Sequence, residues 1–156
     1  MVLMQIVAAA TPEHLAMVRQ LFEEYWRSFG FTPCFQNFAA EVAGLPGYYA
    51  PPAGRLALAF ESGEPAGCIA LRPLDHARAE AKRLYVRPQF RARGLGLALL
   101  QWVIDEARRA GYREMMAIPC PSCGAPWRCT RDWGSSRPAR ISRTQLQARF
   151  TCDSLF

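Results

Sequence analysis

The stretch EAKRLYVRPQFRARGLG, which spans residues 80–96, decides the fold that this sequence predicts. It continues a run of alternating apolar and polar side chains over residues 79–86, which is typical of a strand and is closed by Pro88. Residues 96–110 place their apolar side chains at helical spacing, so the segment 91–96 leads from a strand into a helix. The first N–H groups of a helix have no partner within it and carry positive potential, so such a turn suits a phosphate or pyrophosphate.

The turn itself contains the residues that close contact with an anion requires. Gly94 and Gly96 permit positive φ and let a ligand approach the backbone, and Arg91 and Arg93 supply positive charge. The Gly-Lys-Ser/Thr ending of one common phosphate loop is missing, as is the third glycine of the dinucleotide-binding fold, so neither of those sites is predicted. A glycine turn that merely caps the helix is the other interpretation that these residues allow.

Further elements extend outward from this block in both directions. Thr11 and Pro12 predict the start of a helix as its N-cap and first residue, and Gly63 and Glu64 predict a hairpin turn. The expected order is strand, helix, helix, strand, strand, strand, helix, strand, over residues 3–8, 12–29, 35–45, 55–62, 66–71, 79–86, 96–110 and 112–117.

The composition favours one globular domain. The chain has 156 residues, of which 51% are hydrophobic and 21% are charged, and these values exclude wholesale disorder. No stretch is long enough for a membrane span, and residues 1–10 are apolar without a preceding basic residue, which predicts a first strand rather than a signal peptide. We therefore expect a cytoplasmic protein.

The net charge of +6 is distributed unevenly along the chain. Residues 1–117 contain 13 Lys and Arg against 11 Asp and Glu, whereas residues 118–156 contain six Arg against two Asp. Four of the six cysteines also lie in that last quarter. The total charge is therefore no evidence for a nucleic-acid or membrane partner, and we expect neither.

Residues 80–88, the R-x-x-G-x-G run at 91–96 and the helix that follows resemble the GNAT acyltransferase superfamily. The segment 35–52, with its Phe-Gln-Asn-Phe, Leu-Pro-Gly and Pro-Pro motifs, resembles a bacterial branch of that family. The resemblance covers residues 1–117 and implies one acyltransferase domain. Its implied fold is α/β (α+β by some counts), with helices flanking a mixed, largely antiparallel sheet.

The resemblance implies an acetyl-CoA-dependent N-acetyltransferase, which uses acetyl-CoA as co-substrate and acetylates a primary amine of a small molecule, peptide or protein. Strand backbone would pair with the pantetheine arm, a backbone N–H near Leu84 would stabilise the oxyanion, and the turn amides would hold the pyrophosphate. The implied CoA-binding residues are Leu84, Tyr85, Val86, Arg91, Arg93, Gly94, Leu95, Gly96, Leu97 and Ala98. Dimers are common in the family, so a homodimer is a further expectation. A non-catalytic CoA-binding or regulatory module of the same fold is the alternative.

Glu80 lies at the strand position where the family often places its catalytic glutamate, so it is predicted to accept the proton of the amine. A solvated glutamate on a strand face is the other interpretation. Phe31, Tyr48 and Tyr49 fall in the segment that lines the acceptor pocket in the family, although core aromatics have the same pattern. The two histidines have no partner at ligand spacing, so no metal site is predicted from them.

After residue 117 the regular pattern ends, because residues 118–156 show neither a period of two nor one of 3.6. The family continues here with a helix bearing a leucine–tyrosine pair, a leucine–glycine–phenylalanine turn and two closing strands, none of which is present. One explanation is a zinc-stabilised interaction domain, in which Cys129 and Cys152 complete the CxxC of Cys120 and Cys123. The second CxxC of a zinc ribbon is absent, however. A divergent or disordered tail is another explanation.

A shift of reading frame is the third explanation and the one that we favour. Suppose that the true codons begin one base earlier. The first two bases of each Cys or Trp codon, TG, then become the last two bases of a codon for Leu, Met or Val. The triplet Asp132, Trp133, Gly134 then gives Leu followed by Gly whichever codons are used. With a TCN codon for Ser135, the shifted peptide contains [L/M/V]-[Y/H]-x-x-L-G-[F/L/I/V], which is the missing family pattern. Residues 118–156 are thus predicted to be the frame-shifted remainder of the same domain.

The nucleotide sequence across codons 110–156 tests this prediction. We expect a slip between residues 115 and 118, after which the shifted frame stays open and encodes an apolar helix and strands. An early stop codon in that frame would show the interpretation to be wrong. A protein made as printed is expected to lack the closing elements of the family and to catalyse transfer weakly or not at all.

Overall fold

The computed structural model describes residues 3–28, 35–117 and 127–129. Within these ranges one sheet has the order β1-β2-β3-β4-β5-β6. Its strands are β1 (Met4–Ala8), β2 (Arg55–Glu61), β3 (Glu64–Pro73), β4 (Arg78–Val86), β5 (Glu114–Ala117) and β6 (Trp127–Cys129). The helices are α1 (Pro12–Arg27), α2 (Phe35–Ala43) and α3 (Leu95–Arg109), with short 3₁₀ turns η1 (Gly47–Tyr49) and η2 (Pro88–Phe90). The β4–β5 pair is parallel and the other described pairs are antiparallel, which confirms the mixed, largely antiparallel α/β fold.

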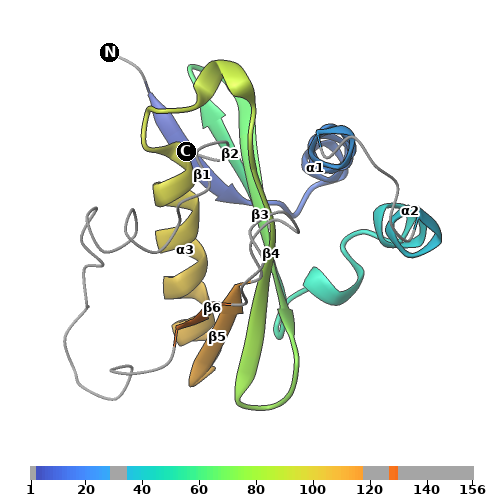
Figure 1. Ribbon diagram of the computed structural model, residues 1–156, viewed down its shortest axis with the longest axis vertical. Helices are drawn as coiled ribbons and strands as arrows, with labels where there is room; N and C mark the ends of the chain where they lie inside the picture. The colour runs from blue at the N-terminus through green and yellow to red at the C-terminus, as the bar shows by residue number, and fades with distance from the viewer. Residues whose placement is uncertain (1–2, 29–34, 118–126, 130–156) are drawn as a thin grey trace.

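Helices cover both faces of the sheet, with α3 on one side and α1 and α2 on the other (Figure 1). The strand β2 shows how the sequence produces two cores. Its Ala57 and Ala59 pack in the cluster beneath α3, while Leu56 and Leu58 pack in the cluster beneath α1 and α2. Successive side chains of a strand point to opposite faces, so an unbroken apolar strand fills both cores at once.

The ends of two helices form as their sequences predict. The Thr11 hydroxyl accepts a hydrogen bond from the His14 N–H at 3.2 Å, and α1 begins with a proline. Gly111, which follows the cap of α3, has φ +89° and is the expected left-handed residue after a helix.

The predicted hairpin is correct, but its centre is shifted by one residue. Ser62 and Gly63, with φ +52° and +85°, connect β2 to β3, whereas the sequence favoured Gly63 and Glu64. A two-residue turn with both φ values positive matches the twist of its strands, which leaves Glu64 free to begin β3. The strand β3 then continues to Pro73, two residues beyond the predicted end.

Ion pairs fix the helices to the sheet, and two of them hold β4 and the residue that follows it. The Arg87 guanidinium binds both carboxylate oxygens of Glu24 on α1, at 2.8 and 2.9 Å. On α2, Glu41 receives a similar two-point contact from Arg83 of β4, at 2.7 and 2.9 Å. Such paired contacts fix orientation as well as distance. β4 is therefore held in place from the face that α1 and α2 cover.

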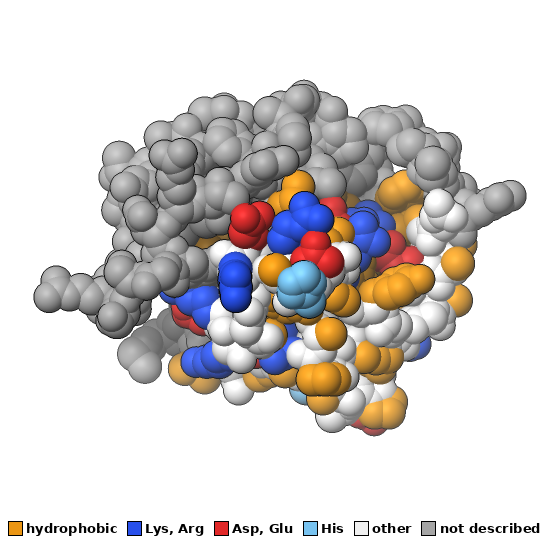
Figure 2. Space-filling view, turned by 90° about the horizontal axis from the view of Figure 1, so that it is seen from below, with side chains coloured by type: hydrophobic (Ala, Val, Ile, Leu, Met, Phe, Trp, Pro, Cys, Tyr) orange, Lys and Arg blue, Asp and Glu red, His pale blue; other side chains and the backbone are white. Residues whose placement is uncertain are grey.

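The described residues were searched for a membrane span, a metal site and a basic surface. Among the described residues, no helix is both long and apolar enough to cross a membrane, and no three His, Cys, Asp or Glu side chains are grouped to hold a metal. Cys120, Cys123 and Cys152 lie outside the described residues, so the zinc hypothesis stays untested. On the face shown in Figure 2, Lys and Arg side chains alternate with Asp and Glu, and the described residues form no continuous basic surface there.

Candidate functional site

The turn that leads into α3 has the backbone geometry of an anion site. Ala92 and Gly94 have φ values of +62° and +86°, the left-handed conformation found in turns whose successive N–H groups bind anions. Gly94 is the N-cap and has no side chain to bond these groups; the first helical bond is from the Ala98 N–H to the Gly94 carbonyl, at 3.0 Å. The N–H groups of Leu95, Gly96 and Leu97 precede that bond and are available to an anion.

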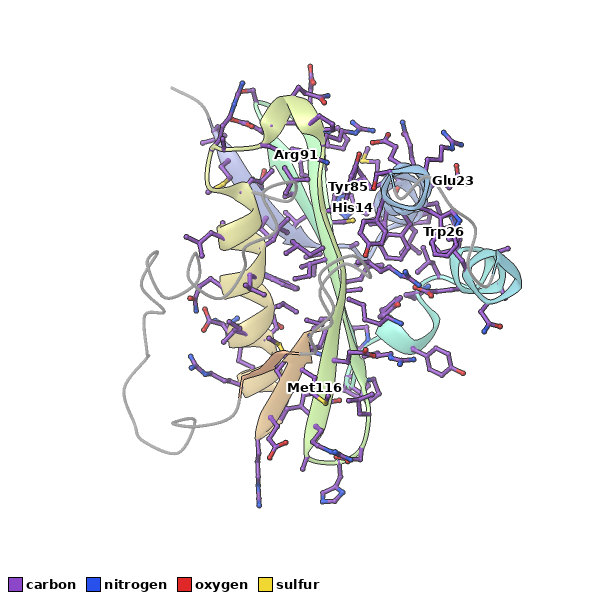
Figure 3. The ribbon with its side chains drawn as sticks, in the orientation of Figure 1. His14, Glu23, Trp26, Tyr85, Arg91 and Met116 are labelled. Carbon is purple, nitrogen blue, oxygen red and sulfur yellow. The ribbon has the colours of Figure 1, made fainter. Side chains whose placement is uncertain are left out.

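The two arginines of the turn have protein partners. The Arg91 Nε donates to the Val86 carbonyl at 2.9 Å, and its guanidinium lies over the Tyr85 ring, 5.9 Å from the centroid. Figure 3 shows Arg91 beside the end of β4 in this position. Arg91 therefore fastens the turn to the end of β4, in addition to the charge that the sequence predicted for it.

Arg93 forms an ion pair with Glu61 at 3.1 Å, although its side chain stays 54% exposed. Glu61 is buried, and its second oxygen, Oε2, has no hydrogen-bond partner among the described residues. The sequence analysis missed Glu61, because nothing local connects it to a turn 32 residues later. Part of the positive charge of the turn is therefore already balanced by the protein.

The edge of β4 becomes free next to this turn. β5 pairs with β4 over Arg78–Ala81, and within the described residues no strand pairs with the same edge at residues 82–86. Tyr85 and Val86 are buried and Leu84 is half-buried there. An unpaired strand edge offers N–H and C=O groups to an extended ligand, which is the role that the resemblance implies for these three residues.

A bulge interrupts β4 at the start of that free edge. Ala70 of β3 lies opposite Lys82 and Cys68 lies opposite Tyr85, so Arg83 and Leu84 together face one residue of β3. Arg83 has φ +58°, which is unusual for a side chain of this size. Because of the bulge, the adjacent Lys82 and Arg83 both line the same pocket.

Glu80 is buried rather than solvated. Its side chain is 3% exposed, and its Oε2 accepts a hydrogen bond from the Arg72 Nε at 2.6 Å across the β3–β4 pair. The interpretation of Glu80 as a solvated residue of a strand face is therefore wrong. The carboxylate is held in a fixed orientation, two residues from Lys82 on the same face of the strand.

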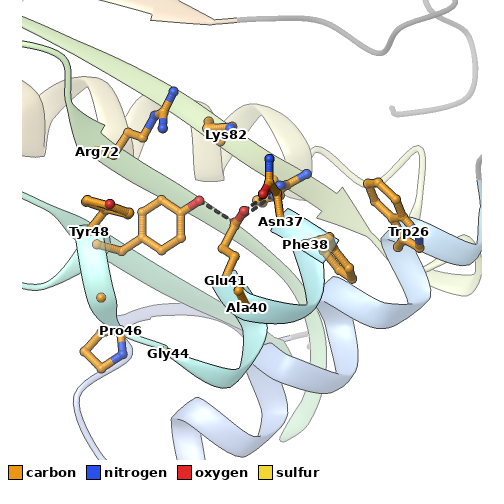
Figure 4. A pocket seen from close by; sticks show the side chains of 13 residues that line it. Trp26, Asn37, Phe38, Ala40, Glu41, Gly44, Pro46, Tyr48, Arg72 and Lys82 are labelled. Carbon is orange, nitrogen blue, oxygen red and sulfur yellow. Dashed lines mark hydrogen bonds and ion pairs between the residues drawn. The ribbon is translucent and has the colours of Figure 1, made fainter. Parts of the chain in front are cut away.

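A pocket of about 570 Å³ lies between α2 and the sheet, next to the free edge of β4 (Figure 4). Its walls combine aromatic side chains with charged ones, namely Trp26, Phe38, Tyr48, Tyr49, Glu41, Arg72, Lys82 and Arg83. Tyr48 and Tyr49, predicted for an acceptor pocket, both line it, and Phe31 lies outside the described residues. Tyr48 is 77% exposed at the rim, whereas Tyr49 is 3% exposed.

Glu41 joins Tyr49 and Arg83 in one network on the pocket wall. Burial alone would raise the pKa of Glu41, but hydrogen bonds from Arg83 and Tyr49 outweigh burial and lower it. Burial, followed by the bond to Glu41 at 2.5 Å, raises the pKa of the Tyr49 hydroxyl far above its ordinary value. Tyr49 is therefore a fixed donor to Glu41. Its aromatic ring, rather than its hydroxyl, is what it offers to a ligand.

The substitution Glu41→Gln should lower the free energy of unfolding by about 2 kcal/mol, because it removes the charge that compensates a mostly buried Arg83. The matched change Glu23→Gln breaks an exposed pair with Arg27 at 3.5 Å and should cost less than about 0.5 kcal/mol. Urea denaturation measures both. Equal losses would contradict the structural role of the Glu41 network.

The same network predicts a pH dependence. The folded pKa of Glu41 lies below its unfolded value, so its stabilising contribution is present at neutral pH and is lost as the pH falls through the folded value. The Gln variant should therefore lose less stability than the wild type on acidification.

Comparison with known proteins gives the family. The family model described as acetyltransferase (GNAT) family matches residues 15–123. An uncharacterized N-acetyltransferase of Schizosaccharomyces pombe is 36% identical over 113 residues, which is 71% of this chain and 69% of the relative. An IAA acetyltransferase of Azospirillum brasilense is 33% identical over 112 residues, or 70% of each chain. With relatives in a yeast and a bacterium, the resemblance of residues 35–52 to a bacterial branch does not establish a bacterial origin.

A solved structure has the same fold. It is a GNAT family acetyltransferase from Brucella melitensis in complex with acetyl-CoA, with a TM-score of 0.62 and 20% sequence identity, covering 76% of this chain and 77% of that one. At this identity the likeness concerns the fold, while the family assignment rests on the family model and on the more similar relatives. The chain belongs to the GNAT family of acetyltransferases.

Proposed function

We propose that this chain is an acetyl-CoA-dependent N-acetyltransferase that acetylates the primary amine of a small molecule. The observation that carries the proposal is the arrangement along β4. β4 leads into the glycine turn before α3, and its free edge at residues 82–86 borders the pocket of about 570 Å³. Acetyl-CoA has a pyrophosphate, an extended amide-containing arm and a reactive thioester, and these three parts match the turn, the edge and the pocket in that order.

The residues of the turn and of β4 would hold the co-substrate. The N–H groups of Leu95, Gly96 and Leu97 bind the pyrophosphate, whereas that of Ala98 is bonded to the Gly94 carbonyl. The backbone of Leu84, Tyr85 and Val86 pairs with the pantetheine arm. A backbone N–H near Leu84 donates to the thioester oxygen and stabilises the negative charge that develops there during attack.

Glu80 serves as the base. An amine attacks only when it is unprotonated, so the site must take up a proton before or during attack. Because Glu80 is 3% exposed and bonded to Arg72, it accepts that proton through one water molecule rather than by direct contact. The amine nitrogen then forms the amide bond, the C–S bond breaks, and CoA leaves as its thiol or thiolate.

Two experiments separate this proposal from the alternatives. Calorimetric titration with acetyl-CoA tests binding, and a thiol-release assay over a panel of amines tests transfer. Binding with amine-dependent thiol release supports the proposal, whereas binding without release over the whole panel favours a non-catalytic CoA-binding module. Failure to bind acetyl-CoA, together with bound zinc in metal analysis, would favour the interaction domain.

The C-terminal quarter must be identified before these assays are interpreted. We propose that residues 118–156 as printed replace the closing helix and strands of the domain. The intact mass of the purified gene product shows which frame it contains. Vigorous transfer by protein whose mass matches the printed tail would refute the expected loss of activity.

A further inference from the structure

Among the residues that the structure describes, Lys82 differs from the other cations of the pocket in having no ion-pair partner. Arg72 is bonded to Glu80 at 2.6 Å, and Arg83 is bonded to Glu41 at 2.7 Å. Lys82 lies between these pairs, half-buried, with neither an ion pair nor a hydrogen bond to any residue that the structure describes. Taking a charged group partly out of water costs free energy unless the charge is paired, so a half-buried ammonium without an ion-pair partner on a pocket wall points to an anionic ligand.

The surroundings of Lys82 favour an anion of one unit charge. Burial and the positive charges of Arg83 and Arg72 lower the pKa of Lys82, and Glu80 and Glu41 only partly oppose this. Both carboxylates are already occupied by arginines, so the net excess on this wall is a single positive charge. A carboxylate would neutralise that excess, whereas a dianionic phosphate would overcompensate it.

The remaining walls define the rest of the molecule that fits. The rings of Trp26 and Phe38 stack at 4.4 Å with an interplanar angle of 9°, and they form an apolar wall. A volume of about 570 Å³ suits a small molecule. Along β4, Lys82 and Glu80 are two positions apart on one face, about 7 Å between Cα atoms. A molecule the size of an amino acid can therefore bind Lys82 and still present its amine towards Glu80.

We propose that the acceptor is a small amine that carries a carboxylate and an apolar or aromatic body, with Lys82 as the ion-pair partner of its carboxylate. This inference rests on the proposed function, because it names the acceptor class of the same site. Lys82 is then a specificity-determining residue, which binds the acceptor without taking part in proton or acetyl transfer.

Binding of matched probes to the full chain, saturated with CoA, tests the inference by calorimetry. The probes are phenylalanine, phenylalaninamide and the phosphonate analogue of phenylalanine. We expect the wild type to bind the acid more tightly than the amide. Lys82→Met should weaken binding of the acid at least tenfold and leave that of the amide unchanged. Lys82→Arg should retain the preference, and Arg27→Met, which removes an exposed cation outside the pocket, should change neither value.

The outcomes separate this inference from the proposed function. An equal affinity of the wild type for acid and amide, or an equal loss of both in Lys82→Met, would overturn it. Tighter binding of the phosphonate than of phenylalanine would overturn the assignment of a carboxylate. The affinity of each variant for CoA shows that it is folded. Failure of the wild type to bind CoA would refute the proposed function instead.

Discussion

Replacing Glu80 by glutamine is expected to lower kcat for acetyl transfer by about 100- to 10,000-fold, the range that loss of a positioned base usually produces. Glutamine keeps the size of the side chain and can still accept the hydrogen bond from Arg72, which measures 2.6 Å in the wild type. It cannot take up the proton of the amine. The affinity for acetyl-CoA should not change, because the turn at residues 91–98 and the edge of β4 are untouched. Thiol release gives kcat, and calorimetric titration gives the dissociation constant.

A second ion-paired glutamate supplies the control. Glu106 is mostly buried and bonded to Arg55 at 2.7 Å, but it belongs to α3, which covers the face of the sheet opposite the pocket. Glu106→Gln should lower stability and leave kcat within a factor of about two, since its carboxylate has no role in proton transfer. A Glu80→Gln enzyme that is as active as the Glu106→Gln enzyme would remove Glu80 from the mechanism.

The substitution Gly94→Ala is expected to weaken acetyl-CoA binding at least tenfold, equivalent to about 1.4 kcal/mol. Gly94 has φ +86°, a conformation that strains alanine by roughly 1–2 kcal/mol. Relief of that strain would rotate the N–H groups of Leu95, Gly96 and Leu97 away from the anion. Calorimetric titration of the variant with acetyl-CoA measures the effect.

Two other glycines make this experiment specific. Gly63 and Gly111 have φ +85° and +89°, and an added Cβ would meet no atom within 4 Å at either position, as at Gly94. Gly63→Ala and Gly111→Ala should therefore cost similar stability, measured by urea denaturation, and leave acetyl-CoA affinity unchanged. The same affinity in all three variants would mean that the turn before α3 does not bind the pyrophosphate.

Local signals made the turn and its helix predictable. Periodicity located α3 to within one residue, and Gly94 and Gly111 mark its two ends, because glycine adopts positive φ with little strain. The strand β4 and the position of Glu80 were predicted in the same way. These features depend on residues that lie within a few positions of one another.

The network on the pocket wall could not be predicted, because it joins distant residues. Glu41 and Arg83 are 42 positions apart, and neither has a local pattern that indicates an ion pair. The positive φ of Arg83 also has no sequence signal, since arginine gives no preference for that conformation. That no described residue forms an ion pair with Lys82 can be seen only once the partners of Arg72 and Arg83 are known.

Transfer of a deuterated acetyl group from acetyl-CoA to an amine, followed by mass spectrometry, tests the central claim most directly. The gene product with residues 118–156 in the shifted frame should convert a carboxylate-bearing amine to its labelled amide and release an equal amount of CoA. The same protein should convert the matching carboxamide more slowly. Absence of label from every amine of the panel, in protein that binds acetyl-CoA, would contradict the assignment of this chain as an N-acetyltransferase.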